Sequence, residues 1–210
     1  MNFEAAIINV SLLWLLTAPH EFAHAWVATK LGDDTPMREG RVTLNPLAHV
    51  DWIGTALLPA VTSLIGGGFL GWGKPVNTNP SRLRWGLNGL ALVALAGPAS
   101  NVIFAVILAL AAVLAFRVAP AFSEYAAKGV QLSLYLAIFN LIPVPPLDGS
   151  RVVDGVVPYT WRRQWESIVR LSPVLLILLV VASQRFGIIT GPANYVVNWL
   201  GDIISAIRTA

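Results

Sequence analysis

The sequence has 210 residues, of which 56% are hydrophobic and only 12% are charged, whereas soluble proteins average about 45–50% and about 25%. The formal net charge of +3 is modest, so composition favours neither a water-soluble globular protein nor a nucleic-acid-binding one. The absence of cysteine excludes disulfides and restricts any metal site to nitrogen and oxygen ligands.

Long stretches without charge predict membrane helices. No charged residue occurs in Trp52–Gly73, Trp85–Phe116 or Gly129–Leu147, and each stretch approaches or exceeds the roughly 20 residues that span a hydrocarbon core. Basic residues and several tryptophans lie at the ends of such stretches, as headgroup contacts would place them. We therefore expect an all-α polytopic membrane protein with about five to six membrane helices, built as a single domain over residues 1–210.

The N-terminal third predicts one long helix followed by polar and irregular chain. Ala5–Thr29 predicts a helix that ends near Gly32, because glycine is a natural C-terminal cap. Within the polar stretch that follows, Arg41–Leu44 alternates polar and apolar residues, which is a weak strand signal. Trp52–Ile65 predicts a shorter apolar helix interrupted at its proline, and the glycine-rich residues 66–76 predict irregular or extended backbone.

Four further segments complete the chain. Trp85–Phe116 predicts the longest span, with a kink or a break at Gly97-Pro98. Lys128–Ile142 predicts a helix that the following prolines terminate, and residues 168–183 predict another span. The tail at residues 193–208 places apolar side chains on one face and polar ones on another, which indicates an interfacial or packed amphipathic helix.

A motif capable of catalysis lies in the first predicted helix. His20 and His24 are four residues apart, so their imidazoles share one helix face and can bind the same metal ion. Glu21, between them, is close enough to act as general base on a water that the metal activates. Chance would produce this spacing in roughly one such sequence in a thousand. The simple alternative is a polar cluster that packs helices together, but a carboxylate within a bilayer is costly enough to suggest function.

A catalytic zinc requires a third protein ligand. Asp148 is the favoured candidate, because the prolines before it and Gly149 after it interrupt the helix and allow its carboxylate to turn inward. His49 is a rival ligand, but it lies in a polar turn, where an interfacial or supporting role is more consistent with its position.

The order of these motifs resembles the site-2 protease family of intramembrane metalloproteases. The resemblance rests on His-Glu-x-x-His in the first helix and on Asn-x-x-Pro-x-x-Pro-Leu-Asp-Gly at residues 140–149. Segments that begin at Gly40, Gly73 and Gly97 also match in order, so the likeness covers most of residues 17–153. Within the family the chain is similar to a minimal core form, without a PDZ or CBS domain.

The resemblance implies a role for each matching residue. His20, His24 and Asp148 would bind one Zn²⁺ per chain, and Glu21 would act as base and later as proton donor. Asn140 would stabilise the oxyanion or position substrate, although capping of the helix end explains it equally well. Asn101 more simply repairs the kink beside Gly97-Pro98.

The resemblance also implies a substrate and a location. Arg41–Leu44 and Leu70–Val76 would be short membrane-associated β-strands that pair with an unwound substrate helix, although both could be ordinary interfacial loops. The expected function is intramembrane, zinc-dependent cleavage of transmembrane or membrane-proximal segments, that is, regulated intramembrane proteolysis. The partners would be the cell membrane, which a multi-pass chain crosses, and a membrane-protein substrate, with no nucleic acid.

Two other functions are consistent with parts of the sequence. A membrane metal-ion transporter could use the same His, His and Asp side chains as a transit site. Transport calls for a chain of polar groups across the bilayer, but the longest predicted span offers only Asn88, Ser100 and Asn101. A non-catalytic scaffold would leave the motif unexplained. The sequence does not indicate the physiological substrate, the regulator, the membrane orientation or the oligomeric state.

Overall fold

The fold was analysed in a computed structural model that describes residues 3–57, 59–61, 71–187 and 190–209. Among these residues the structure is helical and contains no β-strand. The helices in chain order are α1 (Phe3–Lys30), α2 (Thr35–Arg38), η1 (Pro46–His49), η2 (Trp52–Leu57), η3 (Pro80–Arg82), α4 (Leu87–Ala115), α5 (Pro120–Asn140), α6 (Asp148–Val156), η4 (Tyr159–Trp161), α7 (Arg162–Arg170), α8 (Ser172–Phe186) and α9 (Thr190–Thr209). The all-α class is therefore confirmed.

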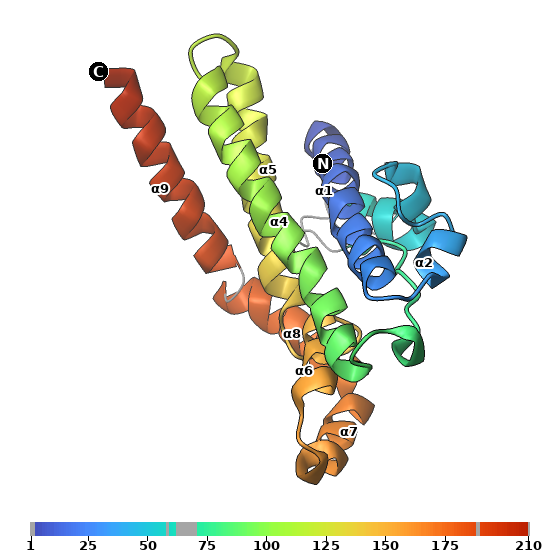
Figure 1. The fold of residues 1–210 in the computed structure, drawn as a ribbon. Helices are drawn as coiled ribbons and strands as arrows, with labels where there is room; N and C mark the ends of the chain where they lie inside the picture. The colour runs from blue at the N-terminus through green and yellow to red at the C-terminus, as the bar shows by residue number, and fades with distance from the viewer. Residues whose placement is uncertain (1–2, 58, 62–70, 188–189, 210) are drawn as a thin grey trace.

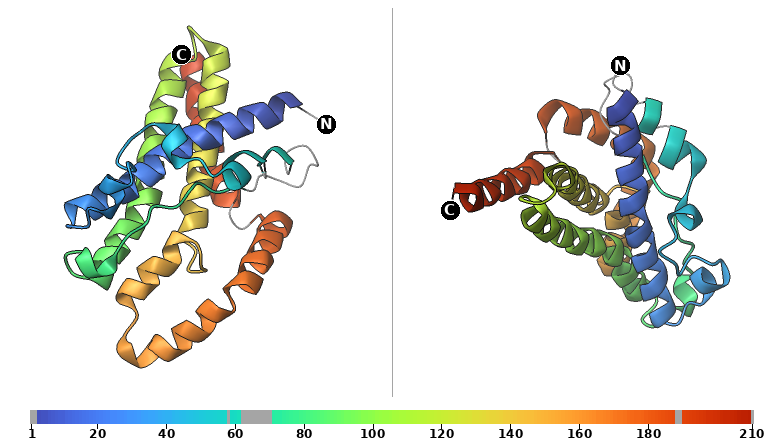
Figure 2. Two further views of the ribbon diagram at one scale, coloured as in Figure 1. Left: turned by 90° about the vertical axis from the view of Figure 1, so that its right-hand side faces the viewer. Right: turned by 90° about the horizontal axis from the view of Figure 1, so that it is seen from above.

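The centre of the molecule is an antiparallel hairpin of α4 and α5 (Figure 1). Helix α1 packs on α4 at one side of this hairpin, and α9 packs on α5 at the other (Figures 1 and 2). Helix α6 packs against α4 near the end at which α4 begins. Because α1 and α6 both rest on α4, that helix determines their relative position.

Small residues make this packing close. Ala94, Gly97 and Ala105 are buried along α4, and a side chain on Gly155 of α6 would lie 2.6 Å from the Leu87 carbonyl oxygen. Large aliphatic side chains of the same helix are exposed instead, for example Leu114 at 80%. Small residues at helix contacts and large apolar residues on the outer surface are typical of packing in lipid.

One helix among the described residues, α4, is long and apolar enough to cross a bilayer. The segment Tyr159–Arg170 together with Ser172–Ser183 passes the same criteria if counted as one span, with a bend of 68° between its halves. The remaining spans of the expected five to six stay predictions. Helix α4 also continues without a break through Pro98, so the break that the sequence allowed there is absent.

Several predicted boundaries differ from the observed ones. Helix α5 begins at Pro120 rather than near Lys128, because the segment before Lys128, which includes Glu124, is also helical. The irregular backbone expected after the second apolar segment is present at residues 71–79. Neither Arg41–Leu44 nor the described part of Leu70–Val76 is a strand. The rest of the prediction for residues 62–70 lies outside the described residues.

Candidate metal centre

The two histidines of the motif face the same point from successive turns of α1. His20 and His24 are both buried, each with 6% of its surface exposed. Their rings meet edge to face with centroids 4.7 Å apart, and their Nε2 atoms are 3.1 Å apart. The four-residue spacing on a helix accounts for this arrangement, because such residues lie one above the other.

Asp148 brings a third donor atom to this point from the distant α6. Its Oδ2 lies 3.1 Å from His20 Nε2 and 3.2 Å from His24 Nε2. The ligand atoms of the three residues all lie within 4.8 Å of one another. Asp148 is the first residue of α6 and follows Leu147, whose backbone is extended. A side chain on Gly149 would lie only 2.2 Å from the Leu141 carbonyl oxygen, so glycine permits the tight approach of this turn.

The hydrogen bonding of His24 indicates that a cation belongs among these three atoms. His24 Nδ1 lies 2.7 Å from the carbonyl oxygen of Val93, which can only accept, so Nδ1 carries a proton. In the neutral ring Nε2 then presents a lone pair toward a carboxylate oxygen and a second imidazole nitrogen. Donors placed about 2.0–2.1 Å from a tetrahedral zinc are roughly 3.3 Å apart, which is close to the observed spacing. The residues present therefore fit zinc.

Gly97 of α4 closes one side of the cluster. A Cβ atom at this position would lie 2.3 Å from His24 Nε2 and 2.6 Å from His20 Nε2. No side chain can occupy that space while the imidazoles stay in place. The glycine that the sequence marked as a kink site thus allows α4 to approach the donor atoms.

Glu21 points into the same region from α1 and is 7% exposed. Its Oε2 has no hydrogen-bond partner among the described residues, and the guanidinium Nη2 of Arg41 is 3.9 Å away. A carboxylate oxygen without a hydrogen-bond partner, on the same cavity wall as the three donor residues, can accept a proton from water.

These groups line a cavity of about 440 Å³. Its polar wall contains His20, Glu21, His24 and Asp148, and its other walls include Asn140 and the irregular chain at residues 71–73 and 75–76. Its volume lies within the range of about 300–1,000 Å³ that is usual for ligand pockets.

The two asparagines considered in the sequence analysis differ in their relation to the cavity. Asn140 lines the cavity, but its Nδ2 donates to the Leu136 carbonyl oxygen at 3.0 Å, which is consistent with the helix-end interpretation. Asn101 is fully buried, and neither of its side-chain polar atoms has a partner among the described residues.

His49 is not part of the donor cluster. Its Nε2 donates to the Thr43 carbonyl oxygen at 2.8 Å. Burial lowers the pKa of His49, and this hydrogen bond only partly opposes the effect. The ring therefore supports the loop around it as a neutral side chain.

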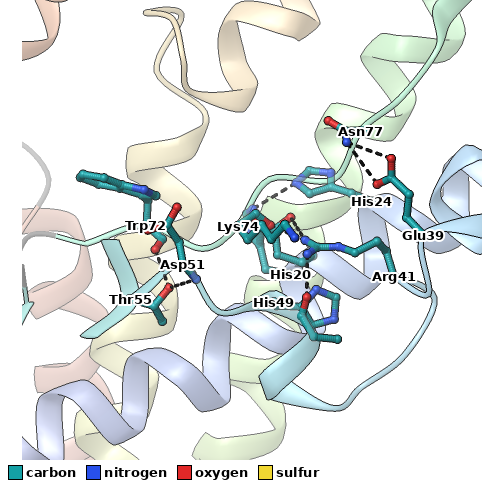
Figure 3. Close-up of polar contacts among 12 residues, drawn as sticks. His20, His24, Glu39, Arg41, His49, Asp51, Thr55, Trp72, Lys74 and Asn77 are labelled. Carbon is teal, nitrogen blue, oxygen red and sulfur yellow. Dashed lines mark hydrogen bonds and ion pairs between the residues drawn. The ribbon is translucent and has the colours of Figure 1, made fainter. Parts of the chain in front are cut away.

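Sequence reasoning missed the parts played by Arg41 and Gly97. Arg41 is 3% exposed and adjoins Glu21, and Figure 3 shows its side chain directed toward Lys74. A single sequence carries no signal for the burial of an arginine in a polar loop. The sequence does show a glycine at position 97 within a predicted span. Its contact with the histidines of α1 depends on helix packing, which the sequence does not reveal.

Comparison with known proteins points to a single family. Residues 117–181 match the model of peptidase family M50, a stretch that includes Asp148 but not the His-Glu-x-x-His motif. No solved structure matches the chain significantly.

Three curated relatives illustrate the similarity. The chain is 41% identical over 147 residues to "Putative zinc metalloprotease YwhC" of Bacillus subtilis, a match that covers 66% of this chain and 64% of the relative. It is 31% identical over 197 residues to "Putative zinc metalloprotease Rip2" of Mycolicibacterium smegmatis, covering 89% of this chain and 72% of the relative. It is 29% identical over 208 residues to the protein of the same name from Mycobacterium tuberculosis, covering 97% and 76%.

Proposed function

Since this chain belongs to peptidase family M50, the site-2 protease family of zinc metalloproteases, we propose that it is an intramembrane zinc-dependent endopeptidase. Its substrates would be transmembrane or membrane-proximal segments of other membrane proteins, cleaved in regulated intramembrane proteolysis. The main support for the proposal is that the donor atoms of His20, His24 and Asp148 lie close together. Glu21 lines the same cavity.

The roles follow from the position of each side chain. His20, His24 and Asp148 would hold one zinc ion, and the Val93 carbonyl oxygen would fix the tautomer of His24 through the 2.7 Å hydrogen bond. When bound, zinc supplies Lewis-acid activation of water and of the peptide carbonyl group. Glu21 would take the proton from the attacking water and later give it to the leaving amine nitrogen. Asn140 on the cavity wall would help to orient the substrate carbonyl.

The irregular chain beside the cavity supports a mode of substrate binding. We call residues 71–76 the docking segment. Trp72 N–H donates to the Gly54 carbonyl oxygen at 2.9 Å, and Lys74 N–H donates to that of His49 at 2.9 Å. The backbone groups of Gly73, between them, have no partner among the described residues. In extended chain, neighbouring residues direct these groups to opposite sides, so Gly73 would offer its N–H and C=O to an unwound substrate.

Such pairing would address the main obstacle to cleaving a membrane helix. A helical substrate satisfies its peptide groups internally, and exposing them in lipid costs several kcal/mol for each group. A backbone edge beside the catalytic residues would compensate part of that cost. We propose that a strand forms at the docking segment, and also at Arg41–Leu44, only once substrate is bound.

The surroundings of the site support a membrane location. Helix α4, which contacts both histidines, is apolar enough to span a bilayer. We propose that residues 1–210 form one domain in the cell membrane, that the chain crosses the membrane several times, and that water reaches the cavity from one membrane face.

The decisive experiment compares wild type with Glu21→Gln. Both proteins would be purified in detergent, their zinc content measured, and cleavage of a fluorogenic single-span peptide followed. We expect the variant to retain zinc, because Glu21 is not among the ligand atoms, and to lose cleavage by several orders of magnitude. Cleavage at an unchanged rate would refute the assigned base. Zinc flux in liposomes that survives Glu21→Gln but not Asp148→Asn would instead indicate a transporter.

A further inference from the structure

We propose that Arg41 is a positioning residue for proteolysis, whose buried guanidinium holds the Glu21 carboxylate and the docking segment in a fixed arrangement. This inference rests on the function proposed above and identifies a residue through which the base and the substrate-binding chain are coupled.

The burial of Arg41 is unusual and calls for an explanation. Its surface is 3% exposed, whereas arginine is almost never fully buried unless its charge is paired. Its backbone N–H donates to the Pro36 carbonyl oxygen at 2.8 Å, so the residue is held at both ends. A cation kept from water in this way costs stability unless its hydrogen bonds and its counter-charge compensate.

The guanidinium group contacts three separate parts of the chain. Nη1 donates to the Ala48 carbonyl oxygen at 2.6 Å, and Nη2 donates to the carbonyl oxygen of Lys74. The same Nη2 lies 3.9 Å from Glu21 Oε2. One planar group therefore joins η1, the docking segment and helix α1, and its rigid fork fixes their separation better than a flexible ammonium could.

These contacts leave the cavity side of the docking segment free. The Lys74 carbonyl oxygen accepts from Arg41, and the Lys74 N–H donates to the His49 carbonyl oxygen. Lys74 does not line the cavity, whereas Gly73 and Pro75 on either side of it do. A Cβ atom on Gly73 would lie 3.4 Å from Glu21 Oε1, which puts this residue of the docking segment beside the base. A peptide aligned on this segment is thereby placed relative to Glu21, and Arg41 maintains that placement.

Arg41 is also the ion-pair partner that the described residues provide for Glu21. It makes no hydrogen bond or ion pair with His20, His24 or Asp148. Removing the guanidinium group should therefore leave the ligand set intact and displace the base and the docking segment. That separation makes the role testable apart from metal binding.

The test uses Arg41→Gln, Arg41→Lys and the control Arg82→Gln, each in the full chain with zinc bound. Arg82 also joins two parts of the chain, through Asp34, but its side chain is 47% exposed. The measurements are zinc affinity by chelator competition, kcat and KM on the fluorogenic single-span peptide, and hydrogen–deuterium exchange at Trp72 and Lys74.

For Arg41→Gln we expect zinc affinity close to wild type and a kcat lower on the order of 10²-fold, the effect of a displacement of about 1 Å at an active site. KM should rise as well, because the displaced docking segment is the proposed binding edge for the substrate, and exchange at Trp72 and Lys74 should accelerate. Arg41→Lys should give an intermediate kcat, because it keeps the charge but lacks the fork. Arg82→Gln should match wild type in every measurement.

Two results would overturn the role of Arg41. The first is an Arg41→Gln protein with bound zinc, wild-type kcat and unchanged exchange. The second is a loss of activity in both Arg41 variants that merely follows loss of zinc or of folded protein. If wild type itself fails to cleave the peptide, the proposed function fails instead, and accelerated exchange in Arg41→Gln still shows whether Arg41 holds the docking segment.

Discussion

At the scale of single residues, the site depends on the direction of nitrogen and oxygen lone pairs and on the absence of a side chain at one glycine. His24 donates through Nδ1 to a backbone carbonyl group, so in the neutral ring its Nε2 presents a lone pair toward the other two donor atoms. Asp148 completes this triangle with a negative charge. Such a concentration of acceptors is stable only with a cation or a proton among them, and this gives Asp148 an importance beyond its hydrogen bonds.

Asp148→Asn is expected to abolish tight zinc binding while keeping the side-chain shape. The amide offers a weaker, neutral ligand, so zinc affinity should fall by more than the 10–100-fold typical of losing an outer-shell partner. Chelator competition on the purified protein measures this directly. Asp154→Asn, a change on the same helix outside the donor cluster, is the matched control and should bind zinc as wild type does. Equal affinity in the two variants would remove Asp148 from the ligand set.

Gly97→Ala should weaken zinc binding although Gly97 donates no ligand atom. The new methyl group would lie 2.3 Å from His24 Nε2, a distance that forces the imidazole or α4 to move. We expect zinc affinity to fall at least about tenfold, comparable with other disturbances of ligand orientation. Gly201→Ala is the control, since its Cβ would meet nothing within 4 Å. Unchanged affinity in Gly97→Ala would show that the helices can separate without cost.

At the scale of elements, the α4–α5 hairpin is stabilised by serine hydroxyl groups as well as by small residues. Ser133 Oγ of α5 donates to the Asn101 carbonyl oxygen at 2.8 Å, and Ser123 Oγ donates to that of Ala112 at 2.8 Å. Both serines are buried. Hydrogen bonds of this kind replace the hydrophobic driving force that is absent between helices in lipid.

Ser133→Ala is therefore expected to destabilise the hairpin by about 0.6 kcal/mol, the average for interhelical hydrogen bonds in membrane proteins. The measurement is reversible unfolding in mixed micelles with increasing denaturing detergent. Ser167→Ala on α7 is the control, because its hydroxyl donates within its own exposed helix. A Ser133→Ala protein as stable as the control would mean that the Asn101 carbonyl group finds another donor.

At the scale of the whole molecule, a bound metal would link α1 and α6 directly, in addition to the contacts that each makes with α4. The ligands come from α1 and from α6, and both helices pack on α4. A bound ion would thus tie residues 20–24 to residue 148, across more than half of the chain. Ligation of this kind stabilises the folded state in proportion to how tightly it binds.

Removing zinc with a chelator should therefore lower the Tm of wild type. At a free zinc concentration about 100 times the Kd, the lost stabilisation is about 2.7 kcal/mol. Thermal unfolding of the detergent-solubilised protein, with and without chelator and after zinc is restored, provides the measurement. The Tm of Asp148→Asn should not respond to the chelator. A similar decrease in both proteins would show that the chelator acts elsewhere.

Local sequence indicated the long helices and the candidate site residues. The His-Glu-x-x-His spacing places His20 and His24 on one face whatever surrounds them, because helix periodicity is a local property. The uncharged stretch around α4 likewise predicts a membrane helix from its length and composition alone. The helix at Lys128 was predicted too short, because α5 extends back from Lys128 through Glu124 to Pro120.

The tertiary structure alone decided which distant groups meet. Asp148 lies 3.1 Å from His20 only because α1 and α6 both pack on α4, and no local pattern encodes that convergence. The burial of Arg41 and the contact of Gly97 with both imidazoles depend in the same way on packing between segments far apart in the chain. Sequence fixes what each residue can do chemically, whereas close packing fixes which residues are near enough to do it together.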